Sequence, residues 1–498
     1  MSKNSNTKYT FDYDNLNNIP RDVLLKIFTN KNTNLFFEKT EKGQKFVPAL
    51  LSRFLIRIWP CKTLRDTGEI WIYDYDTGEY IKNGEEHLTE KIKQLFDKNF
   101  NSNYVNPSIY DIRASTYIDR KDFELPINMI PVKNGILKIP YNGDKLDFSI
   151  IELIENHPDH FVINRIPVEY DPIATCPNWL IYLNLIFNPE DIYCLQEYTG
   201  YTLYRAFPFH KVLMIVGPHN SGKSTFIFII TSLLGPPEIH SINCQSIPLQ
   251  ALEDKFQRVS LYKAMGNFLA DLSPKSLKDS SWFKQITGGD YISAEEKFKQ
   301  GFVFLPYAKH IWSCNKIPYS YDDDDSFYGR WRIIKTGKKI FNPGDPDTDP
   351  HFKYKIAAKE LPGILNWALE GLARLLKQGH FTGEENHTPE KTRELWNSLS
   401  DPLSAFMHSE WVFWNPNTET SKEEFYTHFH GYCIYNNMTP ISKDKFGKEM
   451  KKRYVDNNLI LETYPLINNK QVRCWKGIGI KRQEIDSSDL EYERSMEK

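Results

Sequence analysis

Hydrophobic and polar positions alternate most clearly in the middle of the chain. KVLMIV (211–216) is a short apolar run that ends at a glycine-rich segment, and FIFIITSLL (226–234) is a second apolar run. The first is typical of a buried strand and the second of a helix. From about residue 208 to 345, further apolar runs alternate with loops and helical patterns. This alternation predicts an α/β unit with a mostly parallel sheet.

The pattern before this unit is mixed. EIWIYDYDTGEYI (69–81) predicts two strands joined by a turn, and EEHLTEKIKQLFDKNF (85–100) has the apolar spacing of a helix. PVKNGILKIPYNG (131–143) predicts a tight turn that feeds a strand, and residues 176–207 predict two packed helices. We therefore expect an α+β domain over residues 1–110 and a mostly helical region over residues 111–205.

Two further patterns follow the alternating segment, which ends near residue 345. LPGILNWALEGLARLLKQG (361–379) predicts an amphipathic helix that stops at a glycine. ISKDKFGKEMKKRY (441–454) predicts a helix with one apolar face and basic residues elsewhere, and QVRCWKGIGIKR (471–482) suggests a β-hairpin wing. We expect the α/β unit over residues 206–395 and a winged-helix-like domain over residues 396–498.

Composition narrows the class of protein. A chain of 498 residues should hold roughly three or four domains. No apolar run approaches the roughly 20 residues of a membrane span, and the polar N-terminus has no signal or transit pattern. The seven cysteines form no CxxC pair, so no disulfide framework or structural zinc site is indicated. We expect a cytoplasmic protein without membrane contact.

The glycine-rich segment GPHNSGKST is the strongest chemical signal. It matches the phosphate-binding loop pattern G-x4-G-K-[ST], with a strand before it and a helix after it. Lys223 would neutralise phosphate charge and Ser224 would offer its hydroxyl to magnesium. We expect ATP and Mg²⁺ as ligands. The expected nucleotide-binding residues are Gly217, Pro218, His219, Asn220, Ser221, Gly222, Lys223, Ser224 and Thr225.

Polar residues at later strand ends complete an ATPase pattern. Asp271 follows MGNFLA and would hold magnesium together with Ser224, while Asn315 follows KHIWSC and would orient the attacking water. Arg330 is the candidate arginine finger, with Arg332 as the alternative. Each residue alone is more often a cap, a turn residue or a surface charge. Their order along the chain favours the catalytic interpretation.

A lysine-bearing loop, FKQITGGDYISAEEKFKQGFVF (283–304), lies between Asp271 and Asn315. It carries Lys297 and Lys299 after a tight turn at residues 288–290. The simplest interpretation is an exposed hairpin with solvated lysines. The functional interpretation is a loop beside the nucleotide site that moves with the state of the γ-phosphate and grips single-stranded DNA.

GPHNSGKST, ADLS, KQITGGDYISAEEKFK, IWSCNKIP and YGRW, in this order, resemble the superfamily 3 helicases. The resemblance is to the helicase part of phage, plasmid and poxvirus primase–helicase proteins, over roughly residues 90 to 380. It implies an AAA+ ATPase that forms a hexameric ring and threads single-stranded DNA. Arg330 would then reach the nucleotide bound at Lys223 of a neighbouring subunit, and Lys297 and Lys299 would belong to a pore hairpin. Many members have two adjacent acids where Ala270 and Asp271 stand here, which leaves open the residue that activates water.

The two ends of the chain carry weaker signals. Lys445, Lys448 and Lys452 are candidate contacts to duplex DNA, although a solvated lysine face explains each of them as well. YDYD (73–76) is superficially like the paired aspartates of archaeal-type primases. A turn that closes a hairpin is the favoured interpretation, because no Ser-x-His motif accompanies it.

The sequence therefore favours an ATP-dependent DNA helicase that acts in replication of a mobile genetic element, such as a plasmid, a phage or an integrated element. Its expected partners are single-stranded and duplex DNA, further copies of itself, and a separate primase or initiator. Three alternatives stay open: a DNA-binding initiator whose ATPase drives assembly only, a bifunctional primase–helicase, and a small-molecule kinase. A kinase would not need a basic C-terminal module.

Overall fold

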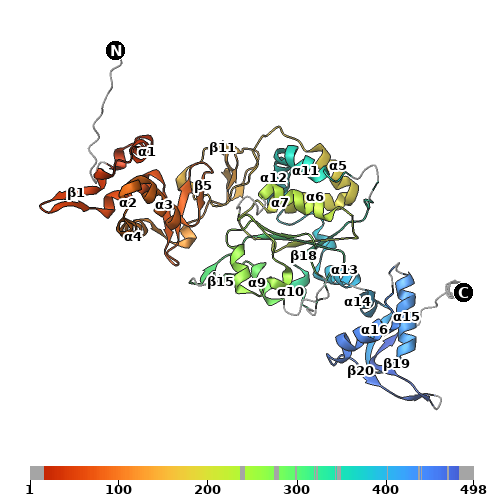
Figure 1. The fold of residues 1–498 in the computed structure, drawn as a ribbon. Coiled ribbons are helices and arrows are strands. Elements are labelled where there is room, and N and C mark those ends of the chain that lie inside the picture. The colour runs from red at the N-terminus through yellow and green to blue at the C-terminus, as the bar shows by residue number, and fades with distance from the viewer. Residues whose placement is uncertain are drawn as a thin grey trace.

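The computed structural model describes residues 16–481 except 236–241, 274–279, 298–299, 319, 321–323, 343, 345–348, 401, 436–437, 439 and 468–469. Figure 1 shows an N-terminal part, a central α/β unit and a C-terminal unit arranged in that order. Within the described ranges, no helix combines the length and apolar character needed to cross a bilayer.

The central unit is built on a five-stranded sheet in the order β13-β14-β17-β12-β18, and all of its neighbouring strands pair in parallel. The strands are β12 (Val212–Val216), β13 (Cys244–Gln245), β14 (Gly266–Leu269), β17 (Lys309–Cys314) and β18 (Trp331–Lys335). Every residue of β12 is buried between β17 and β18. The predicted α/β unit with a parallel sheet is confirmed.

Helices cover both faces of this sheet (Figure 1). One layer consists of α5 (Pro177–Ile186), α6 (Pro189–Tyr201), α7 (Lys223–Leu234), α11 (Phe352–Lys359) and α12 (Leu361–Gln378). The other consists of α9 (Ser281–Ile286), α10 (Asp325–Tyr328) and α13 (Pro389–Ser400). The predicted helix pair before the loop and the predicted helix after the unit are confirmed as α5, α6 and α12. The expected boundary between residues 395 and 396 falls inside α13, and Trp396 is buried in the central core.

The N-terminal part contains a four-stranded sheet, β5-β4-β3-β6, that separates two cores. Its elements are β3 (Cys61–Leu64), β4 (Ile70–Asp74), β5 (Glu79–Ile81), β6 (Tyr117–Ile118), α1 (Arg21–Thr29), α2 (Pro48–Ile58), α3 (Gly84–Phe96) and α4 (Val105–Thr116). Ile70 and Ile72 pack with the helices, while Trp71 and Tyr73 belong to the central core. This alternation follows from the two faces of a strand. The predicted strand pair over 69–81 is confirmed, and the expected boundary at residue 110 falls inside α4.

The prediction of a mostly helical region over residues 111–205 is wrong for its larger part. Beyond α4, this region first forms β7 (Met129–Val132), β8 (Gly135–Lys138) and β11 (Glu152–Ile154), which pair as one antiparallel sheet, and the short pair β9 (Tyr141–Asn142) and β10 (Lys145–Leu146). The turn at Asn134 and Gly135 and the β-branched residues around it favour strands. Only α5 and α6 supply the expected helical packing.

The C-terminal unit has its own core. It contains α14 (Pro402–Met407), α15 (Lys422–Tyr435), α16 (Lys443–Met450), β19 (Val412–Ser421), β20 (Leu461–Thr463), β21 (Leu466–Ile467), β22 (Lys470–Gln471) and β23 (Cys474–Ile480). The expected hairpin does not lie within 471–482. Residues 470–480 supply one arm of it, since β22 pairs with β21 and β23 pairs with β20, and β19 lies on the other side of β23. A Cβ on Gly479 would lie 2.3 Å from Cζ of the Phe413 ring, so this ring packs directly over the glycine.

Two glycines let α6 and α12 pack closely. A Cβ on Gly371 would lie 2.3 Å from the Gln196 carbonyl oxygen, and one on Gly200 would lie 2.2 Å from the Ala368 carbonyl oxygen. We expect Gly371→Ala to lower the free energy of unfolding of the central unit by about 1–3 kcal/mol, because the helices must separate. Thermal unfolding measures this. Gly447→Ala is the matched control, since no atom lies within 4 Å of its Cβ position in α16. Equal stability of the Gly371 and Gly447 variants would contradict the prediction.

Candidate nucleotide-binding site

The glycine-rich segment forms the loop between β12 and α7, and its glycines are required by close neighbours. Gly222 has a left-handed φ of +89°, and a Cβ there would lie 2.8 Å from Cδ1 of Ile186. A Cβ on Gly217 would lie 2.1 Å from Oγ1 of Thr336. The Tyr182 hydroxyl donates to the Gly222 carbonyl oxygen at 2.6 Å. The loop therefore lies at the start of α7 with little space on either side.

Lys223 is the buried cation of this loop. Its ammonium group donates to the carbonyl oxygens of Gly217 (2.7 Å) and Pro218 (2.6 Å) and to Oδ1 of Asn315 (3.1 Å). Burial lowers the pKa of Lys223, while electrostatic interaction with Cys314 and with the Asp271 carboxylate opposes that shift. The structure thus brings Lys223 and Asn315 into contact and places Asp271 within electrostatic range.

The carboxyl ends of the strands explain this convergence. Asp271 follows β14 by two residues, Asn315 follows β17 directly and Thr336 follows β18 directly. Parallel strands bring these ends to the same edge of the sheet as the loop. The Asp271 carboxylate and the Ser224 hydroxyl are both exposed there. They are oxygen ligands of the type that Mg²⁺ uses in nucleotide sites.

Thr336 is a site residue that the sequence reasoning missed. Its Oγ1 lies 2.7 Å from Oγ of Ser221, so it holds the loop against β18. The sequence pattern could have identified Thr336, because it directly follows the apolar strand WRIIK, just as Asn315 directly follows its own strand.

Arg330 lies at the opposite edge of the sheet. Its carbonyl oxygen accepts a hydrogen bond from the Val212 amide at 2.8 Å, at the point where β12 and β18 begin. Five residues of strand, roughly 16 Å, separate this point from the loop. The Arg330 guanidinium donates to Oγ1 of Thr287 at 2.7 Å and to the Lys284 carbonyl oxygen. Burial lowers its pKa, while Asp290 and Asp324 oppose that shift.

Arg332, the alternative finger, is fully buried and paired with Glu384. It therefore presents no charge at the surface, whereas Arg330 remains partly exposed. Of the two arginines, only Arg330 has a side chain near a surface that another molecule could reach.

The lysine-bearing loop is a hairpin of β15 (Ile292–Ala294) and β16 (Phe302–Phe304), with Lys297 exposed in its turn region. Lys299 lies outside the described residues. The hairpin follows Thr287, which contacts Arg330, and it therefore lies toward the Arg330 edge. The expectation that it adjoins the phosphate-binding loop of its own chain is wrong, because β16 leads to the amino end of β17 and not to its carboxyl end.

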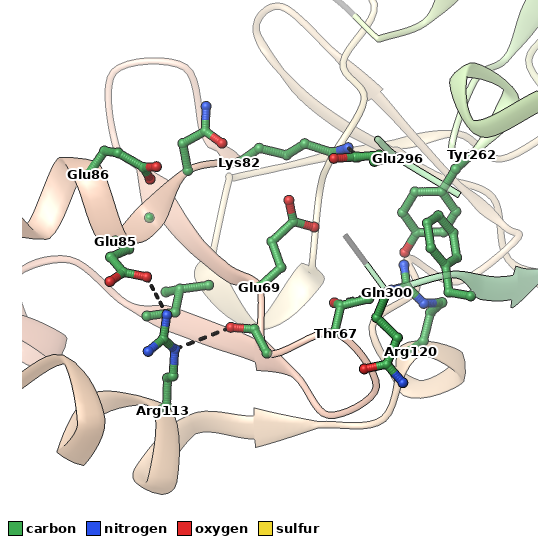
Figure 2. Close-up of a pocket in the computed structure, with 15 residues that line it drawn as sticks. Thr67, Glu69, Lys82, Glu85, Glu86, Arg113, Arg120, Tyr262, Glu296 and Gln300 are labelled. Carbon is green, nitrogen blue, oxygen red and sulfur yellow. Dashed lines mark hydrogen bonds and ion pairs between the residues drawn. The ribbon is translucent and has the colours of Figure 1, made fainter. Parts of the chain in front are cut away.

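The N-terminal part contacts the base of this hairpin. The Arg120 guanidinium lies over the rings of Phe302 (4.1 Å) and Tyr262 (4.7 Å) and pairs with Asp66 through Nε at 2.6 Å. Lys82 reaches across to Glu296 at 3.4 Å (Figure 2). These contacts border a cavity of about 290 Å³ between the two parts of the chain.

The two weaker sequence signals have clear positions. Lys445, Lys448 and Lys452 are exposed on and just after α16, whereas Phe446, Met450 and Tyr454 are buried, so the predicted amphipathic pattern is confirmed. In YDYD, the Asp74 carboxylate accepts from the Asp76 amide (2.9 Å) and the Thr77 hydroxyl (3.1 Å). The interpretation of this motif as a hairpin turn is confirmed.

The fold and the site define an α/β protein with a glycine-rich loop at the carboxyl edge of a parallel sheet. A family model described as "D5 N terminal like" matches residues 56–188, and one described as "Family of unknown function (DUF5906)" matches residues 215–332. The first match overlaps the N-terminal end, from about residue 90 to 188, of the region whose motifs resemble primase–helicase proteins. No curated protein matches the chain.

Solved structures of the NrS-1 C-terminal region are similar to the chain at low identity. "The A form apo structure of NrS-1 C terminal region-CTR" has 9% identity and a TM-score of 0.45, and it covers 87% of this chain and 100% of its own. "The apo structure of NrS-1 C terminal region (305-718)" has 11% identity and a TM-score of 0.44, with 87% and 99% covered.

The Arg120→Lys variant tests whether Arg120 stabilises the β15–β16 hairpin through its contacts with Phe302, Tyr262 and Asp66. Lysine keeps the charge but lacks the planar group that stacks on two rings and pairs with Asp66. We expect faster hydrogen exchange of residues 292–304, by about fivefold, because roughly 1 kcal/mol of local stability is removed. Arg65→Lys is the matched control, because Arg65 also pairs with an aspartate but is 61% exposed. Unchanged exchange in the Arg120 variant would show that the N-terminal part does not hold the hairpin.

Proposed function

We propose that the chain is an ATP-dependent DNA helicase of the superfamily 3 type, which acts as a hexameric ring on single-stranded DNA during replication of a mobile genetic element. The observation that carries this proposal is the division of the site between two edges of one sheet. Lys223, Asp271 and Asn315 gather at one edge, and Arg330 lies at the other. Head-to-tail copies in a closed ring bring opposite edges of neighbours together.

The residues at the loop edge suit ATP hydrolysis. Lys223 would neutralise the β- and γ-phosphates, and Ser224 with Asp271 would hold Mg²⁺, which neutralises further phosphate charge. Asn315 would orient the attacking water. Arg330 of the next copy would stabilise the charge that develops on the transferred group. A single chain cannot supply that arginine to its own loop, since roughly 16 Å of strand separates them.

Thr287 supports a link between hydrolysis and DNA. It accepts a hydrogen bond from Arg330 and begins the segment that leads into the β15–β16 hairpin. The hairpin of one subunit would therefore respond to the nucleotide of its neighbour and move Lys297 along the strand. Lys445, Lys448 and Lys452 belong to a separate core and would bind duplex DNA.

The main alternative is an initiator that uses ATP for assembly only. It shares the nucleotide site and the C-terminal lysines but has no use for a hairpin attached to Arg330. A primase function draws no support from residues 73–76, since Asp74 is engaged in its turn. A small-molecule kinase would leave the C-terminal unit without a role.

The intersubunit site can be tested by mixing inactive variants. Lys223→Ala and Arg330→Ala should each abolish ATP hydrolysis, because each removes a charge that stabilises the transition state. Mixed rings contain some interfaces with both wild-type groups, so a mixture should recover measurable ATPase activity. Intact rings must first be verified by their mass in solution. A mixture that stays inactive at every ratio would place both groups outside a shared site.

Variants at the hairpin lysine and at the C-terminal lysines distinguish the helicase proposal from the initiator proposal. Lys297→Ala should suppress unwinding and DNA-stimulated ATPase activity while basal ATPase activity persists. Ala at Lys445, Lys448 and Lys452 should instead weaken duplex binding and reduce the slope of its salt dependence by up to about 0.9 for each DNA phosphate that is no longer neutralised. Unwinding from a preloaded single-stranded tail should survive this triple change. Normal unwinding by the Lys297 variant would favour the initiator.

A further inference from the structure

His219 lies in the phosphate-binding loop and contacts Asn315. Nε2 of the imidazole is 3.1 Å from Nδ2 of the Asn315 amide. The other end of the same amide, Oδ1, is 3.1 Å from the Lys223 ammonium. The Asn315 amide therefore bridges two residues of one loop. One of its polar atoms contacts an ammonium group and the other contacts an imidazole.

The hydrogen-bonding capacities fix the orientation of this bridge. An ammonium group only donates, so the amide oxygen must face Lys223 and the amide NH2 must face His219. An NH2 group only donates, so Nε2 of His219 must accept and the imidazole proton must reside on Nδ1. The neutral Nδ1–H tautomer is the one form of His219 that completes the arrangement.

The backbone on both sides of the bridge is held in place. Asn220, next to His219, has a left-handed φ of 58°, and its carbonyl oxygen accepts from the Phe341 amide at 2.9 Å. Asn315 directly follows the buried strand β17. Removal of the imidazole would therefore free the amide to rotate about its side-chain bonds rather than shift either backbone.

We propose that His219 is a positioning residue, which holds the Asn315 amide with its oxygen toward Lys223 and thereby sets the orientation in which Asn315 meets the attacking water. The inference rests on the proposed ATPase function. It adds a residue outside the Lys223, Asp271, Asn315 and Arg330 set.

Steady-state ATP hydrolysis by the full-length chain tests the proposal. His219→Leu removes the acceptor, and we expect kcat to fall about tenfold with KM changed less than twofold, since one oriented hydrogen bond is removed. His219→Gln supplies an amide oxygen as acceptor and should restore kcat to within about threefold of wild type. Thermal unfolding should be the same for all three proteins.

The outcomes separate this proposal from the proposed function. ATP hydrolysis by wild type that Lys223→Ala abolishes, together with a fully active His219→Leu variant, would overturn the role of His219 and leave the ATPase standing. A raised KM with unchanged kcat, not restored by glutamine, would also overturn it, because that pattern indicates a distorted loop. Absence of hydrolysis in wild type would overturn the proposed function itself.

Discussion

The parallel pairing of β12 with β17 and β18 is the constraint on which the rest of the structure depends. Because β12 is buried on both sides and along its whole length, the loop after it emerges at a fixed edge. The same pairing brings Asn315 and Thr336 to that edge. It sends Arg330 to the other edge, where it is bound to Thr287. One pattern of backbone hydrogen bonds thus gives the subunit two chemically different sides.

Burial governs the behaviour of the loop as much as its shape does. Lys223 keeps its charge in a buried position through two carbonyl oxygens and the Asn315 amide oxygen. Each of these is a neutral acceptor, and the acidic neighbour Asp271 acts only over a longer range. An ammonium ion held in this way can exchange its two backbone carbonyl partners for phosphate oxygens at a small desolvation cost, because it has already left bulk water.

The sequence was most informative where local rules decide the structure. The strand 212–216, the loop after it and the helix after that follow from apolar run length and glycine placement, and Asp271 and Asn315 follow as polar residues at strand ends. Thr336 and Tyr182 could not be placed in the same way, because their contacts with the loop join segments far apart in the chain. The errors over 111–205 and 471–482 have different causes. The turn at Asn134 and Gly135 was predicted, but the pairing of β8 with β11 joins segments that the local pattern does not link. Within 471–482, Gly479 lies inside a strand, where it packs under the Phe413 ring.

The sheet between the N-terminal core and the central core limits how this chain can be divided. Trp71, Tyr73 and Tyr80 belong to the central core, although their strands come from the part that precedes it. A fragment that starts after residue 110 would lack these three aromatic side chains and expose the apolar surface that they cover, which invites aggregation. The central unit and the N-terminal part are therefore one cooperative folding unit, and an exchange of segments between homologous chains would have to transfer both together.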